Sequence, residues 1–112
     1  SDRMLYAAKY MWYIDMAAYR ETGQSVTGAP YAALPMGPQL NNYRDLVYAI
    51  IKADDRHAEP LTAEEKAIIE RVANAFPTQK KVFDASHREI VWKEKSIGHT
   101  IPYSDTFRLT EI

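Results

Sequence analysis

The side chains most able to coordinate a metal ion lie between Asp54 and Glu59. This run, Asp-Asp-Arg-His-Ala-Glu, places three carboxylates and His57 within six positions. A calcium loop needs oxygen ligands at alternating positions, and a helical zinc site needs two histidines four residues apart. Neither spacing is present, and the chain has no cysteine to supply a thiolate. We therefore expect a solvated charged loop here, with no metal ion and no other cofactor.

Ser86 and His87 are the pair that most resembles a nucleophile with its general base. Consecutive residues of a helix point in different directions, so adjacency alone does not align a hydroxyl with an imidazole. The chain also lacks a glycine-rich phosphate loop and a GxSxG elbow. The sequence predicts a non-catalytic protein in which His87 is a buried or interfacial hydrogen-bonding residue. A small hydrolase that uses Asp15 or His87 is the alternative.

Asp15 is the polar residue that least fits a solvent-exposed position. It lies near the middle of the apolar stripe of a helix predicted over residues 2–22, which consists of Met4, Leu5, Ala8, Met11, Trp12 and Tyr19. A buried carboxylate without hydrogen-bond partners is strongly unfavourable. We expect Asp15 to be a structural anchor that accepts hydrogen bonds from residues 27–38; a catalytic or partner-contacting role is the alternative. A row of tyrosines, Tyr6, Tyr10 and Tyr13, is placed on the opposite side of this helix, facing water, a partner or a missing N-terminal segment.

Residues 27–38 connect two long helical patterns and must position these side chains. The segment holds glycines that permit positive φ angles and prolines that fix φ, namely Gly28, Gly37, Pro30, Pro35 and Pro38. We predict a rigid connector packed against the first helix, with Gly37 at positive φ in a turn. Residues 24–27 have the composition of a short strand and are predicted to pair with residues 31–34.

Helical patterns account for most of the remaining chain. Thr62 and Glu65 match a capping box, and Thr78 is a second candidate cap. Val82, Phe83, Ser86 and Ile90 are predicted to form one buried face. We predict helices over residues 2–22, 41 or 42 to 53, 63–76 and 79–94, with a last short turn in 104–112. The expected fold is one domain over residues 1–112, mainly α (α+β), with four to five helices packed around a short β-ribbon in the Gly-Pro connector.

Composition limits the classes of partner. The net charge of −1 argues against a nucleic-acid-binding surface, and 46% hydrophobic residues is ordinary for a globular domain. No apolar run approaches the roughly 18 residues that a membrane crossing requires. No signal peptide is visible, and the absence of cysteine fits a cytoplasmic protein.

Four segments together resemble the Panacea domain, the SocA-like, phage-associated (GepA-like) antitoxin family. The family pattern is approximately K-x-L-[WY]-Y-x-D, a spacer, and then [ST]-[IV]-T-G-x-x-Y-x-x-L-P-x-G-P. Residues 9–15 and 23–38 match it, and residues 61–65 and 86–93 match later family motifs. The matched motif positions include Trp12, Asp15, Thr27, Gly28, Pro35, Gly37, Pro38, His87 and Trp92. The chain departs from the pattern at Met36, Gln39 and Ile90, which bears on partner identity more than on fold.

The resemblance implies a bacterial protein-interaction domain, the antitoxin of a type II toxin–antitoxin system that neutralises a co-encoded toxin by direct binding. One relative is an adaptor that delivers its toxin to a protease, and some members carry an N-terminal helix-turn-helix, so a proteolytic adaptor and a DNA-binding autoregulator are the alternatives. Self-association stays open. By analogy, the toxin is expected to contact the connector and the adjoining helix, where aromatic and soft apolar side chains gather. The candidate partner-binding residues are Tyr31, Leu34, Met36 and Tyr43, with core packing favoured for the first two and exposure for Met36.

Overall fold

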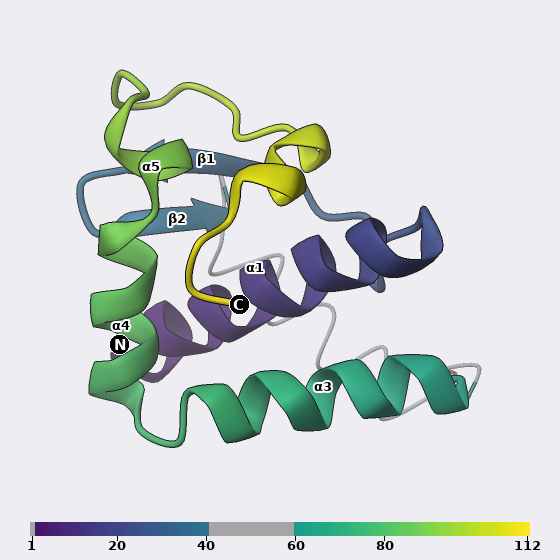
Figure 1. Cartoon of the computed structure of the whole chain (residues 1–112). Coiled ribbons are helices and arrows are strands. Elements are labelled where there is room, and N and C mark those ends of the chain that lie inside the picture. The colour runs from purple at the N-terminus through teal and green to yellow at the C-terminus, as the bar shows by residue number, and fades with distance from the viewer. Residues whose placement is uncertain (1, 41–59) are drawn as a thin grey trace.

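The computed structural model describes residues 2–40 and 60–112 (Figure 1). In this part of the chain a mainly helical architecture surrounds a small antiparallel sheet, which confirms the predicted fold class. The predicted helix that begins at residue 41 or 42, the candidate Tyr43 and the charged run 54–59 lie outside the described residues. The described elements are α1 (Asp2–Thr22), β1 (Tyr31–Leu34), β2 (Gly37–Leu40), α3 (Ala63–Ala75), α4 (Gln79–Arg88), α5 (Ile90–Lys93) and the 3-10 helix η1 (Tyr103–Arg108).

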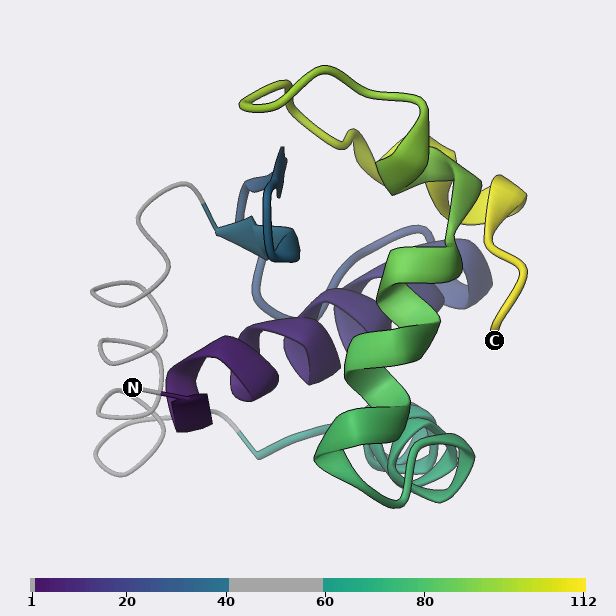
Figure 2. The same cartoon turned by 90° about the vertical axis from the view of Figure 1, so that its left-hand side faces the viewer.

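Helix α1 is the central element of the described structure. It contacts α3, α4, β2 and η1, and Figures 1 and 2 show these elements arranged around it. A helix with neighbours on several sides buries more than one stripe. For this reason the predicted exposed tyrosine row is wrong at Tyr13, which is fully buried and packs on Phe76. The α1 residues with at most 1% exposure are Ala8, Lys9, Trp12, Tyr13, Asp15, Met16, Ala17 and Ala18.

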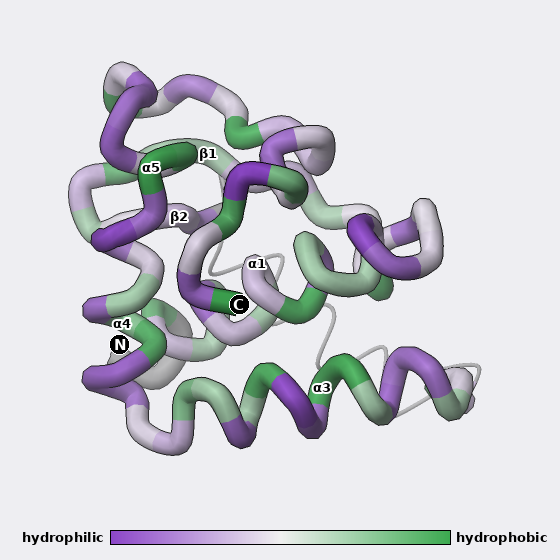
Figure 3. The backbone as a smooth tube through the Cα atoms, in the orientation of Figure 1, coloured by the Kyte–Doolittle hydropathy of each residue, from purple (hydrophilic) through white to green (hydrophobic). Residues whose placement is uncertain are grey.

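Helix α3 begins as the sequence predicts. The Thr62 side chain accepts a hydrogen bond from the Glu65 backbone N–H, and the Glu65 carboxylate accepts one from the Thr62 N–H. These reciprocal bonds satisfy two amide groups that the first helical turn would leave unpaired. Along α3, apolar and polar segments alternate (Figure 3), and the buried Ile68 and Val72 belong to the core.

The single helix predicted over residues 79–94 is wrong, because Glu89 interrupts it. Thr78 caps α4 as predicted, but Glu89 has an extended backbone with ψ of 127° and separates α4 from α5. Its carboxylate is fully buried and bonds to α1 and to the C-terminal segment. The break also turns Ile90 outward, where it is 44% exposed instead of extending the buried face.

The predicted strand over residues 24–27 is also wrong. β1 pairs with β2 in an antiparallel hairpin, in register from Tyr31↔Leu40 to Leu34↔Gly37, with Pro35 and Met36 as the two-residue turn. On its other edge, β1 pairs with residues 98–101: the Gly98 N–H donates to the Ala33 carbonyl oxygen at 2.7 Å. β1 is therefore flanked by β2, its neighbour in the sequence, and by a segment far along the chain. No helix in residues 2–40 and 60–112 has both the length and the hydrophobicity of a membrane span.

Candidate functional site

The connector is fixed to α1 by the Asp15 anchor, which we define as Asp15, Thr27 and Tyr31. Asp15 Oδ1 accepts the Thr27 N–H at 2.8 Å. Its Oδ2 accepts the Thr27 hydroxyl at 2.5 Å and the Tyr31 hydroxyl at 2.7 Å. These are the hydrogen bonds that the sequence predicts for Asp15. Burial, together with the negative charge of Asp15, raises the pKa of Tyr31, so this hydroxyl remains a donor.

Further bonds hold the residues between the anchor and β1. Gly28 has φ of 71°, and its N–H donates to the Ser25 hydroxyl at 2.8 Å. The Ala29 carbonyl accepts the Tyr103 hydroxyl at 2.7 Å, which ties the connector to η1. Burial raises the pKa of Tyr103 to about 12. The connector is therefore fixed to two elements, α1 and η1.

Gly37 lies where the hairpin meets α1 and α4. Its φ of 102° confirms the predicted positive angle. A Cβ at this position would lie 3.0 Å from His87 Cε1 and 3.2 Å from Lys9 Cε. Contacts this short are closer than side chains normally approach, so this close approach requires glycine for its space as well as for its backbone angle.

His87 and Trp92 connect α4 and α5 to the hairpin. The His87 ring stacks on Phe83 with centroids 4.1 Å apart and lies edge-on to Trp92 at 4.7 Å. Trp92 Nε1–H donates to the Leu34 carbonyl oxygen at 2.9 Å, which joins α5 to the end of β1. Both side chains therefore stabilise the position of the hairpin.

Ser86 and His87 are not arranged as a nucleophile and base. The Ser86 hydroxyl donates to the Phe83 carbonyl oxygen at 2.8 Å, and His87 Nδ1 lies 2.7 Å from the same oxygen. A carbonyl oxygen can only accept, so Nδ1 carries a proton and cannot act as a base toward Ser86, 3.4 Å away.

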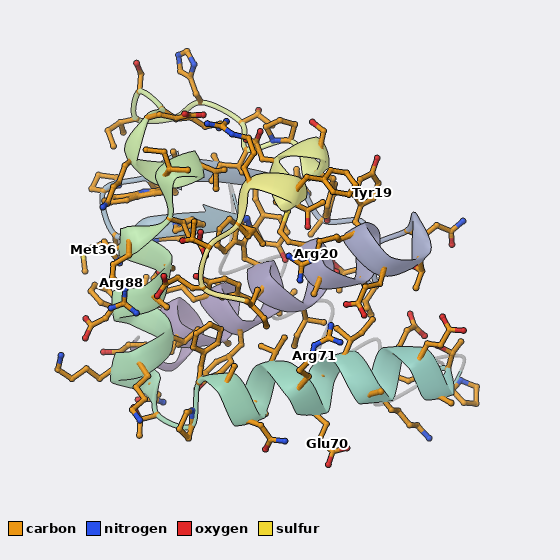
Figure 4. All side chains as sticks on the ribbon, in the orientation of Figure 1. Tyr19, Arg20, Met36, Glu70, Arg71 and Arg88 are labelled. Atoms are coloured by element: carbon orange, nitrogen blue, oxygen red, sulfur yellow. The ribbon has the colours of Figure 1, made fainter. Side chains whose placement is uncertain are left out.

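The candidate partner-binding residues differ widely in exposure. Tyr31 is 1% exposed and belongs to the core, so in this structure its side chain is not available to a partner. Leu34 is half-buried, and Met36 is 47% exposed at the tip of the hairpin, where Figure 4 shows it projecting at the edge of the molecule. Ile97, 60% exposed, precedes the Gly98 that pairs with β1. We call Leu34, Met36 and Ile97 the hairpin-tip surface.

Glu89 is a buried carboxylate that the sequence analysis did not single out. Its Oε1 accepts the Thr110 N–H and hydroxyl, at 2.8 and 3.1 Å. Its Oε2 accepts the Tyr13 hydroxyl at 2.8 Å and the Glu111 N–H at 3.1 Å. We call these four residues the Glu89 anchor. On a continuous helix, Glu89 would lie seven residues after Val82 and three after Ser86, at the edge of the predicted buried face, so helical periodicity is the signal that could have found it.

The charged side chains of the described residues form no metal-binding cluster. Among residues 2–40 and 60–112, no three histidine or acidic side chains group as ligands. A groove beside α4 contains opposite charges that already pair, Arg88 with Glu111 at 2.5 Å, so it presents no uniform field to a charged substrate. It is lined by Ala75, Phe76, Lys81, Asp84, Arg88 and Glu111.

Comparison with known families gives one match. A family model described as "Antitoxin SocA-like, Panacea domain" matches residues 8–93, which include α1 from residue 8 onward, the hairpin, α3, α4 and α5. Searches of curated proteins and of solved structures returned no match. The matched segment contains the Asp15 anchor, Gly37, His87 and Trp92, the residues that fix the hairpin to the helices. The chain therefore belongs to the SocA-like antitoxin family and carries its Panacea domain.

Proposed function

We propose that this chain is the antitoxin of a bacterial type II toxin–antitoxin pair and neutralises a co-encoded toxin by direct contact in the cytoplasm. The family match over residues 8–93 is the observation that carries the proposal. The resemblance also implies a non-catalytic protein. The bonds of Ser86 and His87 to one carbonyl oxygen support this, because they give both side chains a structural role.

The hairpin-tip surface is our proposed contact with the toxin. Met36 and Ile97 are two of the four large apolar side chains that are exposed in the described part of the chain. The backbone beneath them is fixed by the Trp92 bond to Leu34 and by pairing with residues 98–101. A rigid surface loses little conformational entropy on binding, and methionine adapts well to a partner surface.

Coexpression of the chain with the products of neighbouring genes tests the proposal. The wild-type chain should restore growth to cells that express the toxin, and the purified proteins should form a complex. Met36→Asp places a charge in the interface and should weaken toxin binding by roughly tenfold or more. Phe107→Asp is the matched control, because Phe107 is 71% exposed on η1, and it should bind like the wild type.

The same assay distinguishes occlusion from delivery to a protease. Neutralisation by occlusion leaves the amount of toxin in the cell unchanged, whereas an adaptor reduces it in a protease-dependent way. If no neighbouring product is toxic and none binds the chain, the antitoxin proposal is wrong. If a toxin binds but Met36→Asp and Phe107→Asp behave alike, the contact lies elsewhere.

A further inference from the structure

Residues 96–100 cover the outer edge of β1 and contribute little to the core. All five residues are exposed, and none belongs to the hydrophobic core of the described part of the chain. Figures 1 and 2 show the segment between α5 and η1 as a loop at the periphery of the molecule. We call residues 96–100 the strap.

Within residues 2–40 and 60–112, the hydrogen bonds that join the strap to β1 are all between backbone atoms. The Gly98 N–H donates to the Ala33 carbonyl oxygen at 2.7 Å, and the Ala33 N–H donates to the His99 carbonyl oxygen at 2.9 Å. Ala32 and Thr100 form an isolated bridge between these bonds. A backbone hydrogen bond at the surface contributes little net free energy, because water can replace either partner.

Both ends of the strap are held more firmly than its middle. Before it, Lys95 Nζ donates to the Asp105 carboxylate at 2.6 Å and to the Val91 carbonyl oxygen at 3.0 Å. After it, Ile101 is 2% exposed and belongs to the core, and its N–H donates to the Tyr31 carbonyl oxygen at 2.9 Å. A short segment between two fixed points can move without displacing the elements that precede and follow it.

Movement of the strap would uncover the backbone of Ala33, which is 0% exposed. Water can bond to its N–H and carbonyl groups once the strap has moved away, so the open form contains no unsatisfied polar group there. The turn at Gly98 is not fixed by packing either, since no atom lies within 4 Å of its hypothetical Cβ. Opening the strap therefore requires far less free energy than unfolding the core.

We propose that the strap opens from β1 as a local unit while the core stays folded, and that it carries Ile97 away from the hairpin-tip surface when it opens. The closed strap is the predominant state, and in it the surface is complete. In the open state, Ile97 has moved and the edge of β1 presents the free backbone groups of Ala33. The hairpin-tip surface thus has a complete and an incomplete form.

Hydrogen exchange of the full chain tests the proposal, followed by NMR at urea concentrations below the unfolding transition. An amide released by a local opening exchanges at a rate that barely depends on urea, because little surface is exposed, whereas an amide released by unfolding exchanges faster as urea is added. We expect the first behaviour for Ala33 and the second for Ala17, which is buried in α1. Equal urea dependence would show that the strap opens only when the whole chain unfolds, and the proposal would be wrong.

Gly98→Ala and Gly23→Ala are a matched pair of variants for the same measurement. The two glycines have φ of 88° and 81°, and neither has an atom within 4 Å of its hypothetical Cβ, so both variants introduce similar backbone strain. Opening the strap releases the strain at residue 98 only. Gly98→Ala should therefore accelerate exchange of Ala33 by roughly tenfold, and Gly23→Ala should leave it unchanged. If both variants accelerate Ala33 alike, or neither does, the strap does not open by itself.

A last measurement links the strap to the toxin and rests on the proposed function. A toxin that contacts Met36 and Ile97 together binds the closed strap, so exchange of Ala33 should be slower in the complex than in the free chain. Faster exchange would mean that the toxin displaces the strap, and an unchanged rate would mean that it binds elsewhere; either result overturns this link. If no neighbouring product binds the chain, the proposed function fails, and the urea dependence of Ala33 still decides whether the strap opens.

Discussion

Asp15 and Glu89 are two buried carboxylates that solve the same physical problem in different places. Each is fully buried, and neither pairs with a cation in the described structure. Each is instead satisfied by backbone amides and hydroxyl groups, which stabilise a carboxylate without introducing a second charge to bury. Asp15 fixes a connector 12 to 16 residues away, whereas Glu89 joins α1, 76 residues earlier, to a tail 21 to 22 residues later.

The two anchors differ in how their oxygens are used. At Glu89 each oxygen accepts one backbone N–H, whose proton cannot be moved. At Asp15 only Oδ1 accepts a backbone N–H, and Oδ2 accepts two hydroxyl groups, which can rotate and become acceptors. A carboxylate is therefore required more strictly at Glu89 than at Asp15.

The largest effect is expected for Glu89→Gln. Whichever way the amide is oriented, its NH₂ group faces a backbone N–H, so a donor opposes a donor. We expect a loss of about 3 kcal/mol in the free energy of unfolding. Urea unfolding followed by circular dichroism measures it, with the exposed substitution Glu70→Gln as the control. A loss no larger than that of Glu70→Gln would show that the tail bonds contribute nothing to stability.

Lys9 is the contrasting case, a buried charge without a hydrogen-bond partner in the described part of the chain, and it predicts an unusual pH dependence. Its pKa is about 8 in the folded chain and 10.5 when unfolded, so between these values the unfolded chain binds the extra proton. The contribution of Lys9 to the free energy of unfolding should therefore rise by about 2 kcal/mol from pH 8 to pH 10. The raised pKa values of Tyr10, Tyr13, Tyr31 and Tyr103 oppose this rise as pH 10 is approached, because tyrosines ionise there in the unfolded chain.

Urea unfolding of the wild type and of Lys9→Met at pH 8 and at pH 10 checks this rise. In Lys9→Met the increase between pH 8 and pH 10 should disappear. A wild-type curve that falls over this interval would contradict a buried, destabilised ammonium.

Gly37→Ala tests how closely the hairpin is held against the helices, in comparison with Gly28→Ala. Both glycines have positive φ, but only Gly37 has atoms within 4 Å of its hypothetical Cβ. The backbone strain is thus common to the two variants, and the steric cost is confined to Gly37. We expect Gly37→Ala to lose about 1 kcal/mol more than Gly28→Ala in thermal unfolding. Equal losses would mean that Lys9 and His87 move aside freely.

The smallest effect is expected for Asp15→Asn. The amide oxygen can accept the Thr27 N–H, and the Thr27 and Tyr31 hydroxyls can rotate toward the new NH₂ group. The loss in the free energy of unfolding should be about 1 kcal/mol, well below that of Glu89→Gln. If the order of the two variants is reversed in the same urea assay, our explanation by rotatable hydroxyls is wrong.

The sequence predicts one anchor and misses the other for a physical reason. Asp15 interrupts a long apolar stripe, so its burial can be read from periodicity alone. Glu89 lies at a helix break that its own buried bonds create, and those bonds reach residues far away in the sequence. The Thr62 cap was predictable because its bonds are local.

The hairpin shows the same division between local and distant determinants. Gly37 could be assigned a positive φ from its turn sequence, but the pairing of β1 could not be assigned. Pro38 lacks an N–H and argues against a strand, yet it is tolerated because β2 is an edge strand of the sheet within the described residues. Residues 24–27 have better strand composition, but Thr27 is used by Asp15 instead. The exposure of Met36 was predictable from its tight turn. The nearby Ile97 lies in a segment whose sequence has no pattern that predicts where it packs.

The central position of α1 has a consequence for synthesis. The Met16 carbonyl accepts the Thr106 hydroxyl at 2.6 Å, and Arg20 donates to the Ile112 carbonyl, 92 residues later. On the ribosome α1 is made well before the residues that cover it, because Thr106 and Ile112 are translated later. Its apolar sides therefore stay open to chaperones and proteases until those residues have emerged.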